Sequence, residues 1–160
     1  MKNSNLLDRF GQLNLPFKKL IIRKRDGILF VWDEFRMKEI KLTPEEWVRQ
    51  HFLHYLVDYF NYPKKLIAVE KTLKINSLLR RADAVIYGVS GNPKLIIECK
   101  SHLVPLSTDT LHQIAQYNFN LNVEYLILTN GITTMSAYLN KHTKRIDFLN
   151  EIPQYSELLD

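Results

Sequence analysis

Two carboxylates and an ammonium group lie close together in the middle of the chain. Asp83 falls in one β-rich run, and Glu98 and Lys100 fall in the next, with the turn-forming sequence SGNP at residues 90–93 between them. This pattern predicts a β-hairpin. If the chain reverses between residues 90 and 91, Asp83 lies opposite Glu98, with Cβ atoms roughly 4.5–5.5 Å apart.

The expected hairpin also fixes which side chains share a face. Glu98 and Lys100 are two residues apart on one strand, so they point to one face and Cys99 points to the other. Two adjacent carboxylates favour a bound hard cation, because otherwise one of them must take a proton. Mg²⁺ suits oxygen ligands and keeps positions for water and phosphate. The cation would polarise a phosphoryl oxygen and lower the pKa of a bound water, while Lys100 orients that water. These residues predict metal-dependent phosphodiester cleavage, with a structural salt bridge at a sheet end as the alternative.

The surrounding sequence favours the site over the salt bridge. Residues 84–86 and 95–97 are all apolar, which is typical of strands covered on both faces. Charged groups in such a sheet cost free energy unless they pair or bind a metal. A helix expected over residues 111–120 adds Gln113 and Tyr117, which share one helix face because they are four residues apart.

The order of these motifs resembles the PD-(D/E)XK nuclease superfamily, and the Gln113-x-x-x-Tyr117 pair resembles its RecB-like branch. More closely, the chain from about Leu42 to Gly131 is similar to the N-terminal nuclease domain of type I restriction enzyme R subunits. The similar segments are LTPEEWVRQ (42–50), LIAVE (66–70), RAD (81–83), IECK (97–100), QIAQYN (113–118) and LTNG (128–131).

The resemblance implies a role for each matched position on the two strands. Asp83 and Glu98 would ligate Mg²⁺, with Mn²⁺ as a substitute, and the main-chain carbonyl of Cys99 would help. Lys100 would assist the attacking water. The superfamily's nominal Pro-Asp dipeptide is Ala82-Asp83 here, but that proline is variable in the superfamily.

The resemblance also assigns roles to helical residues. Gln113 and Tyr117 would line the site near the scissile phosphate. A glutamate from the first helix belongs to the family's site, and Glu46 is the candidate, with Glu45 second. Glu46 equally fits a capping box with Thr43, which would be a structural role.

Type I R subunits resemble helicases beyond their nuclease domain, but this chain contains no G-x-x-x-x-G-K-[ST] phosphate loop. ATP is therefore not expected to bind, and translocation would need a helicase or translocase partner or other restriction subunits. A homodimer is a further expectation, since cutting both strands of a duplex from one site per chain often calls for a second copy.

Length and composition fit one domain. The chain has 160 residues, of which 46% are hydrophobic and 24% charged. We divide it into an N-terminal extension with a β-hairpin (1–41), a nuclease core (42–131) and a C-terminal extension (132–160). The lone Cys99 excludes an intrachain disulfide. No signal-peptide or membrane-spanning pattern is present, so we expect a cytoplasmic protein without a membrane partner.

The net charge of +5 indicates a polyanionic partner such as DNA. Arg80 and Arg81 come at the entry to the strand that carries Asp83, where they could hold backbone phosphates without reading sequence. A second basic cluster at residues 18–25 has a solvated surface as its alternative interpretation for at least half of its members.

The expected fold is α/β, a restriction-endonuclease-like mixed central sheet flanked by helices, with an N-terminal β-hairpin. His51 and His54 lie on the first helix, and we assign them a surface or packing role because no other His or Cys completes a metal site. The expected elements are a hairpin of residues 19–23 and 28–32 around Asp26-Gly27, a helix over 45–60, strands over 66–75, 82–89, 95–100 and 125–129, a strand or short helix over 132–139, and an edge strand over 146–149.

Two functions of different classes remain open from the sequence. The first is a Mg²⁺-dependent deoxyribonuclease of the restriction or defence type. The second is a catalytically weak or inactive module that binds nucleic acid or protein in a restriction or repair complex. The full set of polar residues favours the first, because a module that only binds has no physical need for every one of them.

Overall fold

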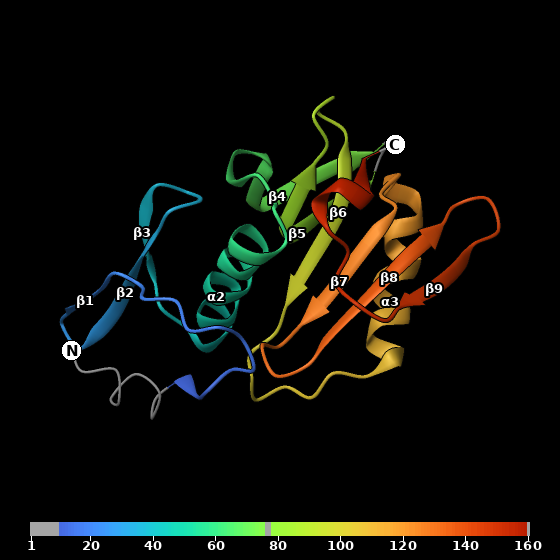
Figure 1. Ribbon diagram of the computed structural model, residues 1–160. Coiled ribbons are helices and arrows are strands. Elements are labelled where there is room, and N and C mark those ends of the chain that lie inside the picture. Colours follow the sequence, from blue (N-terminus) through green and yellow to red (C-terminus); the bar gives the residue numbers. More distant parts are fainter. Residues whose placement is uncertain (1–9, 76–77, 160) are drawn as a thin grey trace.

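A mixed six-stranded sheet lies between two helices in the computed structural model, which describes residues 10–75 and 78–159 (Figure 1). The strand order is β4-β5-β6-β7-β8-β9, and every neighbouring pair is antiparallel except the parallel pair β6–β7. The elements are α2 (Pro44–Tyr59), β4 (Ile67–Ile75), β5 (Leu78–Tyr87), β6 (Pro93–Cys99), α3 (Thr108–Asn118), β7 (Tyr125–Thr129), β8 (Thr134–Asn140) and β9 (Arg145–Leu149), with short 3-10 turns η1 (Lys64–Leu66), η2 (Phe119–Leu121) and η3 (Tyr155–Leu158). The expected fold class is confirmed.

Helix α2 begins where the sequence provides a start signal. The Thr43 side chain accepts a hydrogen bond from the Glu46 main-chain N–H at 3.1 Å, and Pro44 occupies the first turn. The helix ends before Asn61, which adopts a left-handed φ of 59°. Its apolar side packs on one face of the sheet. That buried cluster includes Val48, Phe52, Leu53 and Leu56 from α2 and Ala84, Ile86, Leu95, Ile97 and Cys99 from the sheet.

Helix α3 covers the other face of the same sheet. Ser107 caps it by accepting a hydrogen bond from the Thr110 N–H, and Leu111 and Ala115 are wholly buried. They pack with the alternate residues of the central strands. This second cluster includes Val85, Ile96, Leu126 and Leu128. The central strands are therefore buried on both faces, as their continuous apolar runs predict.

The pairing of β5 with β6 has the register that the sequence predicts. Ala84 pairs with Ile97 and Val85 with Ile96, so Asp83 and Glu98 are the next positions of the same register. The connection reverses at Gly91, whose φ is 83°, and a bulge at Ile86/Tyr87 compensates for the longer turn.

The N-terminal hairpin is confirmed, but its first strand is Ile22–Arg25 rather than residues 19–23, and a third strand joins it. Strands β1 (Ile22–Arg25) and β2 (Ile28–Asp33) join through a two-residue turn in which Asp26 and Gly27 both have positive φ, as a type I′ hairpin requires. A third strand, β3 (Lys38–Lys41), pairs with β2. We did not expect β3, because its sequence KEIK has one apolar residue and no alternation that marks a strand.

The C-terminal segment completes the sheet. The sequence left strand and helix open for residues 132–139, and most of them belong to strand β8, which ends at Asn140; β9 is the expected edge strand. Within the described part of the chain, no helix has the length and apolar character needed to cross a membrane.

His51 and His54 have a packing role, as expected. His51 is 2% exposed, and its Nδ1 lies 2.9 Å from the Trp47 carbonyl oxygen, so Nδ1 carries the hydrogen. Its Nε2 is buried with no hydrogen-bond partner. The ring of His54 packs against Phe35, with centroids 5.1 Å apart. Burial lowers the pKa of both imidazoles.

We expect the free energy of unfolding to fall as the pH decreases below about 6.5, because the unfolded chain then takes up protons on His51 and His54 that the folded protein excludes. The His51→Leu/His54→Leu variant should show a flatter pH dependence between pH 7 and 5, measured by urea denaturation. His112→Leu, which removes an exposed imidazole, is the control. An unchanged slope in the double variant would contradict this assignment.

Candidate active site

The Asp83 carboxylate is fixed at the end of β5 by two donors. Its Oδ2 accepts the main-chain N–H of Cys99 at 2.7 Å, and its Oδ1 accepts from Nη2 of Arg49 at 3.1 Å. The main-chain ladder between β5 and β6 reaches Ala84 and Ile97. The side chain of Asp83 thus acts as a hydrogen-bond acceptor for β6 one step beyond that ladder.

The three residues at the end of β6 alternate as predicted. The Cys99 side chain is fully buried in the cluster on the α2 face, so the alternation of a strand directs Glu98 and Lys100 to the opposite side. Glu98 is 9% exposed, and Lys100 is half-buried with its N–H donated to the Thr129 carbonyl. Burial, reinforced by Asp83, raises the pKa of the Cys99 thiol, which keeps this side chain protonated in the core.

The backbone of β4 is distorted directly beside Asp83. Glu70 has a φ of 52°, and the β4–β5 ladder passes from Val69↔Ala84 to Lys71↔Ala82 without pairing Glu70 and Asp83. A positive φ outside glycine costs free energy and concentrates at functional sites. Here the distortion directs the Glu70 carboxylate to Arg36 at 2.8 Å and to Arg81 at 2.9 Å.

Two arginines neutralise the acidic groups around this point. Arg49 binds Glu46 at 2.9 Å and Asp83 at 3.1 Å, and Arg36 binds Glu46 at 2.7 Å. Both guanidinium groups are nearly buried. Burial opposes their charge, but the neighbouring carboxylates outweigh it and raise the pKa of each. Arg36 also pairs with the buried Asp33. For Glu70, burial opposes ionisation, but the arginines outweigh it and lower its pKa.

A cleft of about 490 Å³ opens beside this network. It lies where the end of β3, the first turn of α2, β4 and the segment after β6 meet. Its lining residues are Ile40, Lys41, Thr43, Pro44, Glu45, Glu46, Arg49, Glu70 and Ser101. Most of its lining residues are charged or polar, and the cleft is open on one side, which suits an extended charged substrate better than a small enclosed ligand.

The sequence left two roles open for Glu46, one in a helix cap with Thr43 and one near the site, and its contacts fit both. Its N–H is bound by the Thr43 side chain, so the predicted N-cap exists. Its carboxylate is engaged by Arg36, Arg49 and Gln50, and it is 4% exposed. Glu45 is about half exposed and lies 3.7 Å from Arg49.

The remaining predicted residues lie outside the network of Arg49 and its carboxylate partners. Gln113 and Tyr117 share the exposed side of α3, and Tyr117 is 63% exposed. Helix α3 packs on the sheet face opposite to α2 and Arg49. Arg81 is exposed and paired with Glu70. The side chain of Arg80 lies outside the described residues.

Sequence reasoning missed Arg49, Arg36 and Glu70 as parts of this site. The spacing of Arg49 three residues after Glu46 is a signal for an ion pair on one helix face. Glu70 within an apolar strand is a second signal. Arg36 carries no local signal, because it follows β2 in a turn and reaches Glu46 and Glu70 only through the tertiary fold.

The donors at the strand ends suit a hard cation. In the described part of the chain, no three His, Cys, Asp or Glu side chains are grouped to hold a metal ion. Mg²⁺ is usually held by one or two carboxylates together with water and phosphate oxygens, so the expected set of Asp83, Glu98 and the Cys99 carbonyl stays a prediction. Arg49 already pairs with Asp83, so a bound cation would have to share the Asp83 carboxylate with this guanidinium group.

The mixed sheet between two helices, with acidic residues at the ends of adjacent central strands, defines a restriction-endonuclease-like domain. The chain belongs to the family Type I restriction enzyme R protein N terminus (HSDR_N), whose family model matches residues 44–153. The match begins at α2 and covers all six strands of the main sheet.

The fold is also similar to a solved fragment described as an HsdR subunit of a type I restriction enzyme from Vibrio vulnificus YJ016. The TM-score is 0.53 at 17% sequence identity, over 73% of this chain and 24% of that chain. The chain therefore spans about a quarter of the length of that chain. A comparison with curated proteins gave no match.

We expect Arg49→Met to lower the free energy of unfolding by about 3–5 kcal/mol, because it leaves the buried Glu46 and the partly buried Asp83 with less compensation. Arg145→Met, which removes an exposed guanidinium 3.7 Å from Asp147, should change it by less than about 0.5 kcal/mol. Chemical denaturation at pH 7 measures both. Equal effects of the two variants would show that the Arg49 network adds no stability.

Proposed function

We propose that this chain is a Mg²⁺-dependent deoxyribonuclease of the restriction type. One observation carries the proposal: the Asp83 carboxylate accepts the main-chain N–H of Cys99, the residue that lies between Glu98 and Lys100 in the sequence. Membership of the R-protein N-terminal family supports the assignment.

The residues at the strand ends would have different roles in the reaction. Asp83 and Glu98, with the Cys99 carbonyl, would hold the ion, and Mn²⁺ could replace Mg²⁺. The ion would supply polarisation of the phosphoryl oxygen and a bound water of lowered pKa. Lys100, which follows Glu98 and Cys99 directly, would orient the attacking water and offset charge on the phosphate.

Residues around the strand ends would position DNA. Lys41 and Ser101 line the cleft, and Arg81 is exposed at its β5 side, where a phosphate could replace Glu70 as its partner. Gln113 and Tyr117 would contact a strand that passes over the α3 side. Glu46 acts through Arg49, which it holds against Asp83, so we regard it as a positioning residue.

The second candidate function is a binding module without catalysis. The observation that favours it is Arg49, which already neutralises Asp83 and so reduces the need for a metal ion. In either case, an associated helicase or translocase or other restriction subunits would supply movement along DNA, and a second copy of the chain could cut the opposite strand.

We expect wild-type protein to nick supercoiled plasmid DNA with Mg²⁺ or Mn²⁺ and not with EDTA. Asp83→Asn, Glu98→Gln and Lys100→Met should each slow cleavage by about 100-fold or more, since each removes charge from the reacting centre while nearly keeping side-chain size. Asp147→Asn, on the exposed edge strand, is the matched control and should cut like wild type.

Metal-dependent cleavage that survives in all three variants would place the activity elsewhere. No cleavage by wild type, together with DNA binding that weakens with salt, would establish the binding module instead.

A further inference from the structure

The N-terminal three-stranded sheet packs one face against the rest of the protein, and the β2 residues on its other face are partly exposed. Leu29 and Val31 of β2 point inward and pack with Phe10, Leu42 and Trp47. Strand alternation therefore turns Ile28, Phe30 and Trp32 outward. Ile28 is 40% exposed, and Phe30 and Trp32 are partly exposed. The outer face thus carries a central apolar column.

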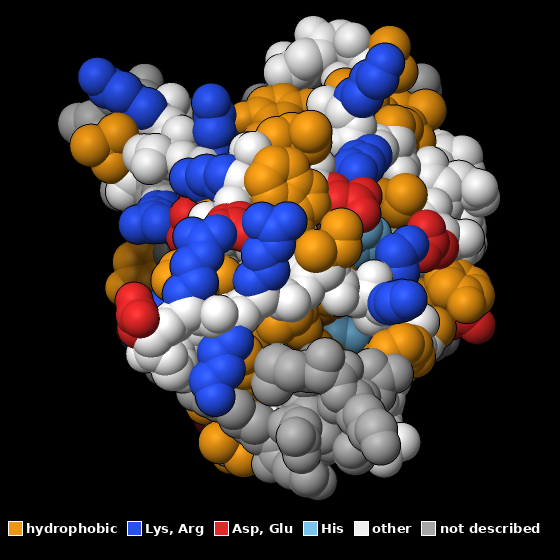
Figure 2. Space-filling view, turned by 90° about the vertical axis from the view of Figure 1, so that its left-hand side faces the viewer, with side chains coloured by type: hydrophobic (Ala, Val, Ile, Leu, Met, Phe, Trp, Pro, Cys, Tyr) orange, Lys and Arg blue, Asp and Glu red, His pale blue; other side chains and the backbone are white. Residues whose placement is uncertain are grey.

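Basic side chains flank this column on both sides. In the register of the sheet, Arg23 lies opposite Phe30, Arg25 opposite Ile28, and Lys41 opposite Phe30 from the other strand. The Arg25 guanidinium lies 5.5 Å from the centre of the Phe30 ring. Figure 2 views the molecule from this end, where Lys and Arg side chains gather with hydrophobic side chains between them.

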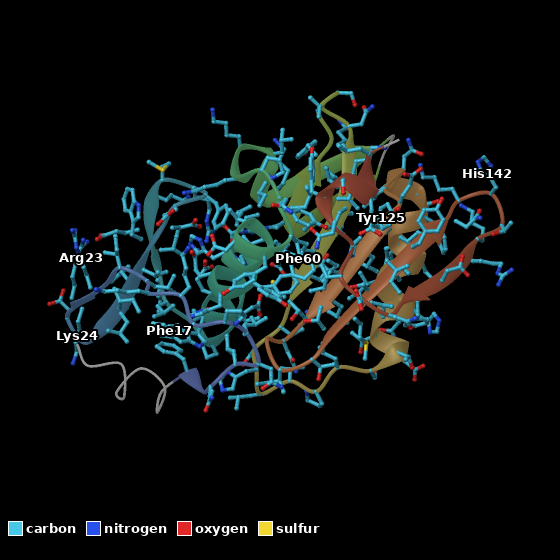
Figure 3. All side chains as sticks on the ribbon, in the orientation of Figure 1. Phe17, Arg23, Lys24, Phe60, Tyr125 and His142 are labelled. Atoms are coloured by element: carbon cyan, nitrogen blue, oxygen red, sulfur yellow. The ribbon has the colours of Figure 1, made fainter. Side chains whose placement is uncertain are left out.

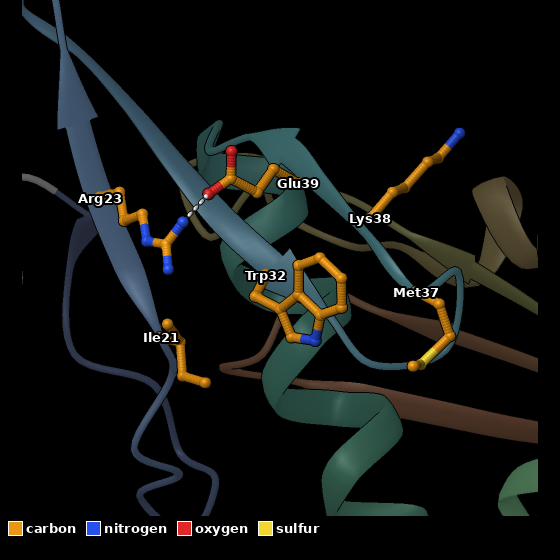
Figure 4. A pocket seen from close by; sticks show the side chains of 6 residues that line it. All are labelled: Ile21, Arg23, Trp32, Met37, Lys38 and Glu39. Carbon is orange, nitrogen blue, oxygen red and sulfur yellow. Dashed lines mark hydrogen bonds and ion pairs between the residues drawn. The ribbon is translucent and has the colours of Figure 1, made fainter.

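A groove of about 630 Å³ runs along one side of the column (Figure 4). The Trp32 indole lies between Arg23 on one side and Met37 on the other, and Met37 and Ile21 are 69% and 57% exposed. Its lining residues are Ile21, Arg23, Trp32, Met37, Lys38 and Glu39. Glu39 is the acidic member, and it pairs with Arg23 at 3.0 Å and with Arg25.

Exposed rings between cations match a single strand of nucleic acid. Bases of an unpaired strand stack on aromatic side chains, while basic residues bind the phosphates on either side. A duplex presents base edges instead, and reading them needs polar side chains. The outward positions of β1, β2 and β3 hold Ile, Arg, Phe, Trp, Glu and Lys, without Asn, Gln, Ser or Thr.

The outer face of the sheet adjoins the candidate cleft at Lys41. Lys41 lies opposite the outward-facing Phe30, and it also lines the cleft that contains Glu46, Arg49 and Glu70. A strand bound on the sheet could therefore continue past Lys41 into that cleft. The three-stranded sheet β1–β3 precedes residues 44–153, the part of the chain that the family match covers.

We propose that the outer face of β1–β3 is a binding platform for single-stranded DNA, with Trp32 and Phe30 stacking bases and Arg23, Arg25 and Lys41 contacting phosphates. The proposal deepens the nuclease assignment, because it adds an unpaired strand as a form of DNA that this chain binds beside the cleft. Binding on this face does not itself require cleavage.

Fluorescence anisotropy of labelled oligo(dT), measured with full-length protein over a salt series in EDTA, tests the platform. Trp32→Ala should weaken binding about tenfold or more. Arg23→Ala/Arg25→Ala should weaken it and reduce the slope of log affinity against log salt by about 1.4. Glu39→Gln should tighten binding, since it removes the acidic group and frees both arginines.

The charge-matched control is Lys141→Ala/Arg145→Ala. These residues flank His142 at the opposite end of the molecule from Arg23 and Lys24 (Figure 3). This control should bind oligo(dT) as wild type does. Thermal unfolding of every variant verifies that the fold is intact.

Tryptophan fluorescence gives an independent signal. The chain has two tryptophans, and Trp47 is buried. Oligo(dT) should quench wild-type emission, and Trp32→Phe should abolish the quenching while largely retaining binding, because the phenyl ring still stacks.

Three outcomes would overturn the platform: no binding of oligo(dT), binding unaffected by Trp32→Ala, or equal losses in the arginine and control pairs. Tighter binding of duplex DNA or of oligo(rU) through the same residues would also overturn it. Trp32-dependent binding without cleavage would retain the platform and reject the nuclease, whereas cleavage with Trp32-independent binding would do the reverse.

Discussion

The rest of the site depends on the double engagement of the Asp83 carboxylate. One oxygen holds the Cys99 N–H of β6, and the other holds Arg49 of α2. Three elements are thereby joined at the point where the β5–β6 ladder ends. A side chain used as a sheet acceptor cannot rotate away, so the position of the carboxylate is set before any ligand binds. Such preorganisation is what electrostatic catalysis requires.

Burial makes the charges around Asp83 costly unless each is matched. Arg36 and Arg49 lie between Asp33, Glu46, Glu70 and Asp83, and every carboxylate in this group has an arginine partner. Arg36 comes from the turn after β2, so the same network ties the three-stranded sheet to α2 and β4. The apolar contacts of Trp47 with Phe10, Leu29 and Val31 join the two parts a second time. The distorted φ of Glu70 is a local cost that these ion pairs offset.

The sequence was sufficient for the features that local rules determine. The register that places Asp83 beside Glu98 follows from two apolar runs and a turn, and α2 follows from Thr43-Pro44 and the buried residues after it. It was insufficient where partners are distant in the chain. The strand β3 has little apolar pattern and forms because β2 offers it an edge. Arg36 and Glu70 meet only after the hairpin sheet packs beside α2, so no spacing along the chain reveals them.

The position of Arg49 raises the question whether a metal ion binds Asp83, because the guanidinium group and the ion would share this carboxylate. Crystals grown with Mn²⁺ and a short DNA strand, examined by anomalous diffraction, test this most directly. Our account predicts an anomalous peak bound by Asp83 and Glu98, with the Asp83–Cys99 hydrogen bond retained. DNA in the cleft with no peak at these carboxylates, while Arg49 alone occupies Asp83, would contradict it.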